Sequence, residues 1–265
     1  LTNVVPAVSS TVGAFAGSFQ WGPVDEVVTV SDSQGLVDNF YHPANTDAGA
    51  EDFYTAEGFL RYGSALRIVR VNATGLYSAN YSGHATSLIK NLEEYRSTYK
   101  DLSQHTNVGK FTSKYAGLLG NSLKTSVCAS SDAYYNDAVS STHATTGDAA
   151  IGATTVNLVA DGGAKFTVGD IITFANHTTH YQITAISTDA LTIKALNQPA
   201  GTGLTTAIVD STSIDRYWEH YASFDKAPGK SASALAAGGS NDEMHVVILD
   251  EDGLFTGTAG TVLET

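Results

Sequence analysis

Hydrophobic positions in the first quarter of the chain alternate between strand and helix patterns. Residues 11–30 contain two strand candidates, which are separated by Trp21-Gly-Pro because proline cannot donate to a β-ladder. Apolar residues at helical spacing then predict one helix that begins near Ser31 or Ser33 and another over about residues 50–62. A β-branched run at 66–71 predicts a strand. The order β-β-α-α-β favours an α/β layer.

Later segments repeat both patterns less regularly. Residues 88–99 have helical spacing, whereas 123–129 and 244–249 are apolar runs that predict strands. The segment 228–241 is rich in Gly, Ser and Ala and predicts an exposed loop. Residues 250–253, Asp-Glu-Asp-Gly, are typical of a turn.

Between about residues 144 and 206 helical spacing disappears. Short β-branched runs are separated by turn residues and predict strands at 154–159, 171–174, 180–186 and 190–195. We therefore predict an α/β (α+β) parent domain that contains a small all-β insertion domain. The expected division is 1–143 for the first part of the parent domain, 144–211 for the outward-facing β module, and 212–265 for the return.

Charge argues against two classes of partner. The 265 residues carry 14 Lys and Arg against 27 Asp and Glu, for a net charge of −13. Phosphate backbones and anionic membranes need clustered basic residues, so neither nucleic acid nor membrane is an expected partner. Only 15% of residues are charged, against about 25% in typical proteins. Much of the surface is therefore uncharged, which is compatible with packing against copies of the same chain but does not by itself indicate it.

Two features could carry chemistry. The single cysteine, Cys128, lies in a strand pattern, which favours a buried structural thiol over a nucleophile. Five acidic residues gather near the end of the chain and either bind a hard cation or build a turn: Asp242, Glu243, Asp250, Glu251 and Asp252. Their spacing is not that of an EF-hand loop, so the turn is the favoured interpretation.

The histidines do not indicate a metal site or a catalytic site either. His177 and His180 are three residues apart in a strand region, where they point to opposite faces. The others are scattered: His84, His105, His143 and His220. No Ser-His-Asp set, nucleophile elbow or phosphate loop can be identified. We therefore predict no catalytic, cofactor-binding or metal-binding residue. Trp21 either packs in the core or anchors a neighbouring subunit.

Four segments in order resemble one family. Residues 13–26 contain a Gly-x-Phe…Trp-Gly-Pro run, and residues 52–71 lead from a helix into Leu-Arg-Ile-Val-Arg. Residues 114–127 contain Lys-Tyr-Ala-Gly…Gly-Asn-Ser-Leu, and residues 241–253 end in the acidic turn. Together they resemble the contractile-tail sheath proteins of myovirus-type phages. The β module has no counterpart in this resemblance.

The resemblance implies a structural role without catalysis. Sheath subunits form stacked helical rings around a tail tube, held between baseplate and tail terminator proteins, and contraction drives the tube into the host during genome ejection. The implied location is the virion, after assembly in the host cytoplasm. The family's N-terminal arm and C-terminal domain have no match here, so a fragment is expected.

Other functions remain open. The chain could belong to a related bacterial contractile injection system, which the sequence does not separate from a phage. It could be a carbohydrate-binding adhesive protein, which predicts exposed aromatic residues in the β module, where the candidates are Phe166, Phe174 and Tyr181. A hydrolase is a further class, but nothing nominates its residues.

Overall fold

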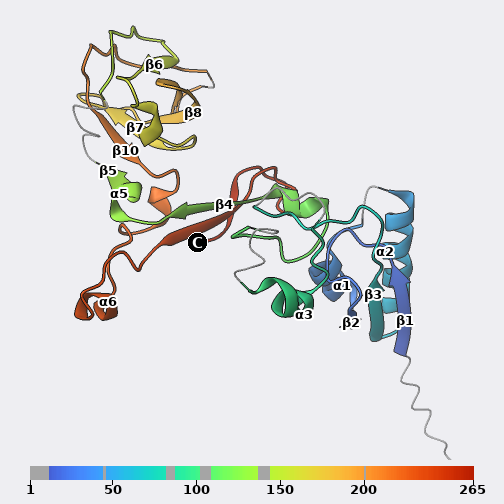
Figure 1. The fold of residues 1–265 in the computed structure, drawn as a ribbon. Helices are drawn as coiled ribbons and strands as arrows, with labels where there is room; N and C mark the ends of the chain where they lie inside the picture. The colour runs from blue at the N-terminus through green and yellow to red at the C-terminus, as the bar shows by residue number, and fades with distance from the viewer. Residues whose placement is uncertain (1–11, 44–45, 82–86, 102–108, 137–143, 200) are drawn as a thin grey trace, which may run out of the picture. The chain divides into compact units, whose positions relative to one another are not determined.

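The computed structural model describes residues 12–43, 46–81, 87–101, 109–136, 144–199 and 201–265 (Figure 1). Contacts divide the chain into two compact units. Unit 1 comprises Leu1–Thr125 with Leu249–Leu263, and unit 2 comprises Ser126–Ile248 with Glu264–Thr265. Both helices and strands are present, so the predicted mixture of α and β structure is confirmed.

Unit 1 begins with a three-stranded sheet. Its strands are β1 (Val12–Gly17), β2 (Val27–Val30) and β3 (Ala65–Arg70), in the order β1-β3-β2. The strand β1 runs parallel to β3, with Phe15 opposite Ile68, and β2 runs antiparallel to it. A parallel pair needs a long crossover, which here contains β2 and two helices. The β-β-α-α-β prediction is confirmed.

The two helices pack on one face of this sheet (Figure 1). Helix α1 (Ser33–Phe40) contacts β2, and α2 (Asp47–Leu60) contacts β1 and β3. Their inward side chains form one core with the sheet: Phe19, Val30, Leu36, Phe40, Phe53, Ala56, Leu60, Leu66 and Ile68. The predicted N-caps Ser31 and Ser33 were wrong, because the carboxylate of Asp32 between them accepts the Gly35 amide at 2.8 Å.

The predicted helix over 88–99 begins later than expected. Helix α3 (Leu92–Glu94) continues into the π-helical turn η1 (Tyr95–Tyr99). The preceding residues are held outside the helix, because the Ile89 amide donates to Ser78 Oγ at 3.0 Å and the Lys90 carbonyl accepts from the Val24 amide at 2.8 Å. The 3₁₀ turn η3 (Leu118–Ser122) then leads into β4 (Leu123–Cys128).

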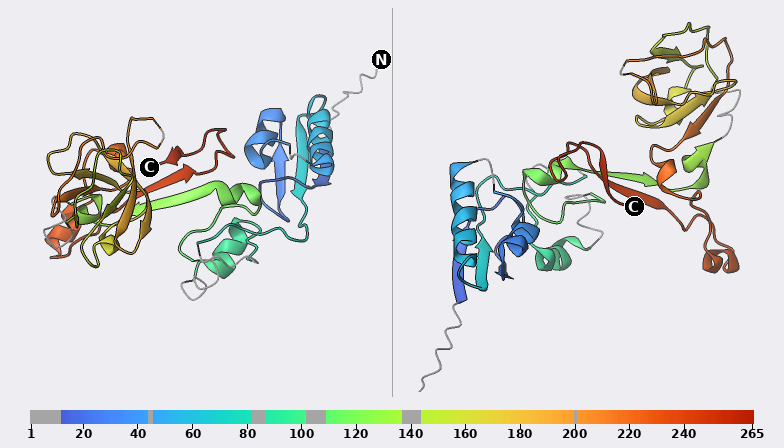
Figure 2. Two further views of the ribbon diagram at one scale, coloured as in Figure 1. Left: turned by 90° about the horizontal axis from the view of Figure 1, so that it is seen from above. Right: turned by 180° about the vertical axis from the view of Figure 1, so that it is seen from behind.

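Unit 2 is dominated by a six-stranded antiparallel sheet of order β5-β10-β7-β8-β9-β6. Its strands are β5 (Tyr135–Asn136), β6 (Thr155–Asn157), β7 (Ile171–Phe174), β8 (Tyr181–Ser187), β9 (Ala190–Ala195) and β10 (Ile214–Tyr217). The sheet curls around its own core, in which Ile172, Tyr181, Ile183 and Leu191 are fully buried (Figure 2). The predicted strands 171–174 and 190–195 are confirmed residue for residue.

Unit 2 also contains short helical segments before, within and after this sheet. They are α5 (Ser131–Tyr134), η4 (Gly163–Lys165), η5 (Tyr221–Ser223) and α6 (Ala232–Ala236). Helix α6 lies inside the predicted loop 228–241 and corrects that prediction: Ser231 Oγ caps it by accepting the Ala234 amide at 3.2 Å. The division at 144–211 stays a prediction. The six-stranded sheet uses strands on both sides of that range.

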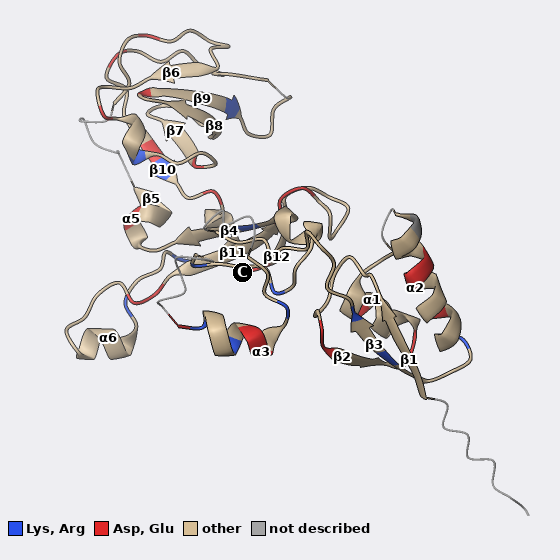
Figure 3. Ribbon diagram, turned by 45° about the vertical axis from the view of Figure 1, so that its right-hand side comes forward, with Lys and Arg blue, Asp and Glu red and all other residues tan. Residues whose placement is uncertain are grey.

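A third sheet has the order β12-β11-β4, with β11 (His245–Asp250) in the centre and β12 (Thr261–Glu264) at an edge. The predicted strands 123–129 and 244–249 correspond to β4 and β11. Basic and acidic residues are interspersed along the described chain (Figure 3). In that same part of the chain, every helix is too short or too polar to cross a membrane.

Candidate functional site

A buried arginine connects three separate segments of unit 1. Arg70 at the end of β3 is 2% exposed. Its Nε donates to the carbonyl oxygen of Phe19 at 2.6 Å, and its Nη1 donates to those of Gly22 and Ala116 at 2.8 Å each. Burial lowers the pKa of Arg70 to about 10, so the guanidinium stays charged at neutral pH. The buried charge is therefore stabilised by backbone carbonyl dipoles, which folding brings together from separate segments of the chain.

The loop at Gly117 approaches the backbone of the neighbouring Gln20 so closely that only glycine fits. Gly117 has a φ of 135°, and a Cβ there would lie 2.5 Å from the carbonyl oxygen of Gln20. Its amide donates to the carbonyl of Tyr77 at 2.9 Å. Gly117 thus lets the 114–117 segment reach the Trp-Gly-Pro turn.

Trp21 packs edge-on against two rings from distant parts of unit 1. Its ring centroid lies 5.5 Å from that of Tyr115 and 5.3 Å from that of Phe255. The Tyr41 hydroxyl donates to the carbonyl oxygen of Leu254 at 2.6 Å, which fastens the same C-terminal loop. The Trp21 side chain is only partly exposed, so its intramolecular packing is established and its role as an anchor for a neighbour stays a prediction.

Asp250 builds the turn that carries Phe255. The carboxylate is fully buried and accepts from Ser122 Oγ at 2.5 Å, the Phe255 amide at 3.0 Å and the Thr256 amide at 2.8 Å. Burial alone raises the pKa of Asp250, but these hydrogen bonds outweigh burial and hold the pKa below its usual value. The turn interpretation is confirmed for Asp250.

The other acidic residues do not gather around it as ligands. Asp242 accepts from the Ser231 amide at 2.9 Å, and Glu243 accepts from the Gly229 amide at 2.9 Å. Glu251 pairs with Lys124 at 3.6 Å. Among the residues that the structure describes, no group of three or more His, Cys, Asp and Glu could hold a metal ion.

These contacts join the four segments singled out in the sequence. Arg70 of the second segment holds Gly22 of the first and Ala116 of the third, and Ser122 of the third holds Asp250 of the fourth. Segments as far as 128 residues apart thus meet in one polar and aromatic junction. We call it the Arg70–Asp250 junction. It is held together by hydrogen bonds and ring contacts.

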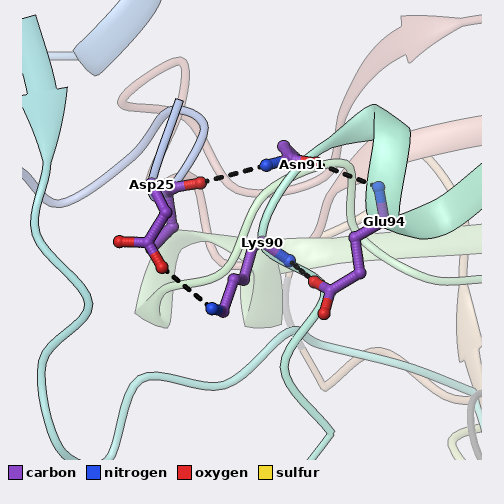
Figure 4. Close-up of polar contacts among 5 residues, drawn as sticks. Asp25, Lys90, Asn91 and Glu94 are labelled. Atoms are coloured by element: carbon purple, nitrogen blue, oxygen red, sulfur yellow. Dashed lines mark hydrogen bonds and ion pairs between the residues drawn. The ribbon is translucent and has the colours of Figure 1, made fainter. Parts of the chain in front are cut away.

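A smaller cluster fixes α3 to the loop that leaves this junction (Figure 4). Asn91 caps α3 by accepting the Glu94 amide at 3.0 Å and donates to the Val24 carbonyl at 3.2 Å. The Glu94 carboxylate accepts the Lys90 amide at 2.6 Å, while Lys90 Nζ lies 2.9 Å from Asp25 Oδ2. The sequence pattern predicted a helix in this region but not the hydrogen bonds and ion pair that attach it to the loop.

Within the described residues of unit 1, the face of the β1-β3-β2 sheet opposite the helices carries exposed side chains, and we call it the open sheet face. Val12 is 53% exposed and Val27 is 60% exposed, and Ala14 and Arg67 lie on the same face. Exposed apolar side chains on a sheet face are typical of protein contacts. This open sheet face is the candidate interaction surface of unit 1.

The remaining predicted candidates have structural surroundings. Cys128 is buried, its Sγ lies 3.4 Å from the Ser130 carbonyl oxygen, and burial raises its pKa, which confirms a structural thiol. His177 contacts Tyr181, whereas His180 contacts Tyr217. His220 lies beside Glu219 at 3.5 Å. His84, His105 and His143 lie outside the described residues.

Comparison with known proteins identifies a class of protein that the sequence of this chain resembles. The chain is 32% identical over 125 residues to a tail sheath protein of Vibrio phage KVP40, an alignment that covers 44% of this chain and 18% of the relative. It is 32% identical over 117 residues to a tail sheath protein of Salmonella phage ViI, covering 44% and 17%. Over 62 residues it is 42% identical to the Enterobacteria phage T4 tail sheath protein, covering 23% and 9%.

The predicted resemblance to phage tail sheath proteins is confirmed by these three relatives. The chain spans less than a fifth of the length of each of them. No protein-family model matches it. The resemblance supports a structural, sheath-like role.

Proposed function

We propose that the chain is part of a contractile phage tail sheath subunit, which polymerises helically around a tail tube and contracts to drive the tube through the host envelope. The observation that carries this proposal is the 32% identity to a phage tail sheath protein over 125 residues. All three relatives are named for phages, which favours a phage over a bacterial injection system.

Such a function needs interfaces instead of reactive groups. Head-to-tail contacts that do not close generate a helical array, and contraction requires two arrangements of these contacts that differ in free energy. The open sheet face, with Val12 and Val27 exposed, supports the presence of contacts with other chains. The proposed partners are further copies, the tail tube protein, and baseplate and tail terminator proteins. Neither nucleic acid nor membrane is a proposed partner.

The β module at 144–211 is proposed to lie on the outside of the sheath, and residues 1–143 and 212–265 to form the sheath α/β domain. A hydrophobic core that lies mostly within 144–211 and also includes Ile214 supports this assignment, because such a module can vary without disturbing the Arg70–Asp250 junction. The virion is the proposed location, after assembly in the host cytoplasm.

The adhesive alternative expected exposed aromatic residues within the module. Phe166 is 6% exposed, Phe174 1% and Tyr181 0%, so these three rings serve the core. This observation does not favour a module built for adhesion through those residues.

The test is negative-stain electron microscopy of the full protein that contains these residues, expressed alone and with its tube protein. Hollow tubules with a helical surface are the expected result. Dispersed particles, from protein whose circular dichroism shows it folded, would contradict the proposal. Val27→Lys should block tubule formation, whereas Leu235→Lys, at a residue 67% exposed in unit 2, is the matched control. Tubules that survive Val27→Lys would exclude the open sheet face as a contact.

A further inference from the structure

Three tyrosines of unit 2 form a row of closely spaced, mutually tilted rings outside the hydrophobic core. Tyr135 of β5 lies 4.7 Å from Tyr217 of β10, centroid to centroid, and Tyr217 lies 4.9 Å from Tyr221 of η5. The His180 ring lies 5.7 Å from Tyr217. Tyr135 is 39% exposed, and the other two are partly exposed. The row is therefore partly exposed to solvent.

A pocket of about 300 Å³ adjoins this row and shares Tyr221 and His180 with it. The other polar residues that line it are Thr178, Thr179, Asn197 and Gln198. They come from the loop between β7 and β8 and from the turn after β9. The volume is at the lower end of the range of small-ligand sites, about 300–1,000 Å³.

Hydrogen bonds hold the walls of the pocket in place. Thr205 Oγ1 lies 2.9 Å from Thr179 Oγ1 and 2.9 Å from the hydroxyl of the buried Tyr181. The Leu196 amide donates to the His180 carbonyl at 2.9 Å, which ties the turn to the loop. Rigid walls reduce the entropy lost when a ligand binds.

The polar groups that face the pocket suit hydroxyl groups. Amides of Asn197 and Gln198 both donate and accept, and the Thr178 hydroxyl does the same. Within the described part of the chain, no hydrogen bond engages these three side chains. None of the residues that line the pocket is an Asp, Glu, Lys or Arg. The ligand chemistry that matches is neutral and rich in hydroxyl groups.

The tyrosine row adds an apolar surface with polar edges. The pKa of Tyr217 is raised to about 12, mainly by burial and secondly by the neighbouring Tyr135. The Tyr217 hydroxyl therefore stays protonated. Asp215 lies on the same face of β10 and also contributes to that shift. A carboxylate at this position disfavours anionic ligands.

We propose that the tyrosine row and the adjoining pocket form a binding site for a neutral glycan. One sugar residue occupies the pocket and exchanges hydrogen bonds with Thr178, Asn197 and Gln198. The next residue places its apolar face on Tyr221 and Tyr217, as amphipathic rings permit. The site is separate from the proposed sheath function. Sequence reasoning missed it because Tyr135, Tyr217 and Tyr221 lie outside the 144–211 range.

The experiment is calorimetric titration of the full protein with maltohexaose, cellohexaose and chitohexaose, and with tetragalacturonate as the anionic comparison. At least one neutral probe should bind with a dissociation constant in the millimolar range or below, and more tightly than tetragalacturonate. Tyr221→Ala and Gln198→Ala should each weaken that binding about tenfold, which corresponds to about 1.4 kcal/mol. Tyr221→Phe, which keeps the ring, should retain most of it.

Tyr81→Ala is the matched control, because this tyrosine is 73% exposed in unit 1 and should leave binding unchanged. Gln198 is on an exposed turn, so its variant keeps the test valid if Tyr221→Ala unfolds. Failure of all three neutral probes to bind would overturn the proposal, as would equal losses in Tyr81→Ala. Defects in tubule assembly without glycan binding would instead assign the tyrosine row to a contact between copies, and would also overturn it.

Discussion

The guanidinium of Arg70 donates a 2.8 Å hydrogen bond to the carbonyl oxygen of Ala116, 46 residues further along the chain. The same side chain holds Phe19 and Gly22, 51 and 48 residues back. Its hydrogen-bond partners in the described residues are backbone carbonyl groups. Charged donors form stronger hydrogen bonds than neutral ones, so a single side chain can fix the Trp-Gly-Pro turn and the 114–117 loop together.

Replacement of this arginine by a residue of similar length should destabilise unit 1. Arg70→Met leaves three buried carbonyl oxygens without their donor, at an expected cost of about 3 kcal/mol in the free energy of unfolding. Urea denaturation would measure it through Trp21 fluorescence in a Trp218→Phe background, since the chain has two tryptophans. Arg67→Met, on the exposed face of the same strand, should change the free energy by less than about 0.5 kcal/mol. Equal effects of the two substitutions would contradict the role assigned to Arg70.

Asp250 predicts a specific loss of stability in acid. Its folded-state pKa lies below the usual value, so the carboxylate contributes stability above its unfolded pKa, and that contribution is lost as pH falls through the folded pKa. In Asp250→Asn the side-chain NH2 group, which can only donate, would face the hydrogen-bond donors of Ser122 or Thr256. We therefore expect the free energy of unfolding to fall by about 2 kcal/mol at pH 7.

The same variant should show a flatter dependence of unfolding free energy on pH below 4 than the parent protein. Asp252→Asn is the control, because Asp252 is exposed two residues away in the same turn. Parallel pH profiles for Asp250→Asn and the parent would refute the assignment.

Sequence patterns identified most elements in which one local signal dominates. The short β-branched runs of β7 and β9 have the bounds expected from their residues. Where two signals competed, the pattern was less reliable. Helical spacing over 88–99 did not overcome the pairing of Ile89 with Ser78, and a Gly-rich composition concealed helix α6.

The junction could be predicted only in part. The sequence singled out the segments that contain Trp21, Arg70 and Asp250, but their convergence depends on contacts between residues up to 128 apart. Arg67 and Arg70 are three residues apart on one strand, so their side chains lie on opposite faces of the sheet. No local pattern in the sequence shows which of these two faces is buried. The tyrosine row likewise depends on the pairing of β5 with β10. In this pairing Tyr135 lies opposite Tyr217, which is 82 residues further along the chain.

Asp170 should make unit 2 less stable at neutral pH than in mild acid. The carboxyl is 6% exposed, and burial raises its pKa from 3.8 to about 6 despite a hydrogen bond from the Thr167 amide at 2.8 Å and the nearby charge of Arg216. Because the folded state binds the proton more tightly, the unfolding free energy falls as pH rises from 3.8 to about 6.

Asp170→Asn should therefore stabilise unit 2 at pH 7.5 by about 2 kcal/mol and remove that pH dependence. The measurement is denaturation at pH 4.5 and 7.5, followed by Trp218 fluorescence in a Trp21→Phe background. Asp225→Asn, at an exposed position in the same unit, should have no comparable effect. A loss of stability in Asp170→Asn at pH 7.5 would show that the charged carboxylate is favourable in the folded state.

Two glycines of unit 1 should respond to alanine in opposite directions. Gly58 lies inside α2 with no atom within 4 Å of an added Cβ, so Gly58→Ala should stabilise the unit by about 0.5–1 kcal/mol through helix propensity. Gly117 has a φ of 135° and would place its Cβ 2.5 Å from the Gln20 carbonyl oxygen. Gly117→Ala should therefore cost more than about 1 kcal/mol and loosen the Arg70–Asp250 junction. Thermal unfolding of both variants would measure the two changes in stability. A Gly117→Ala protein as stable as its parent would contradict the close approach of this loop to the Trp-Gly-Pro turn.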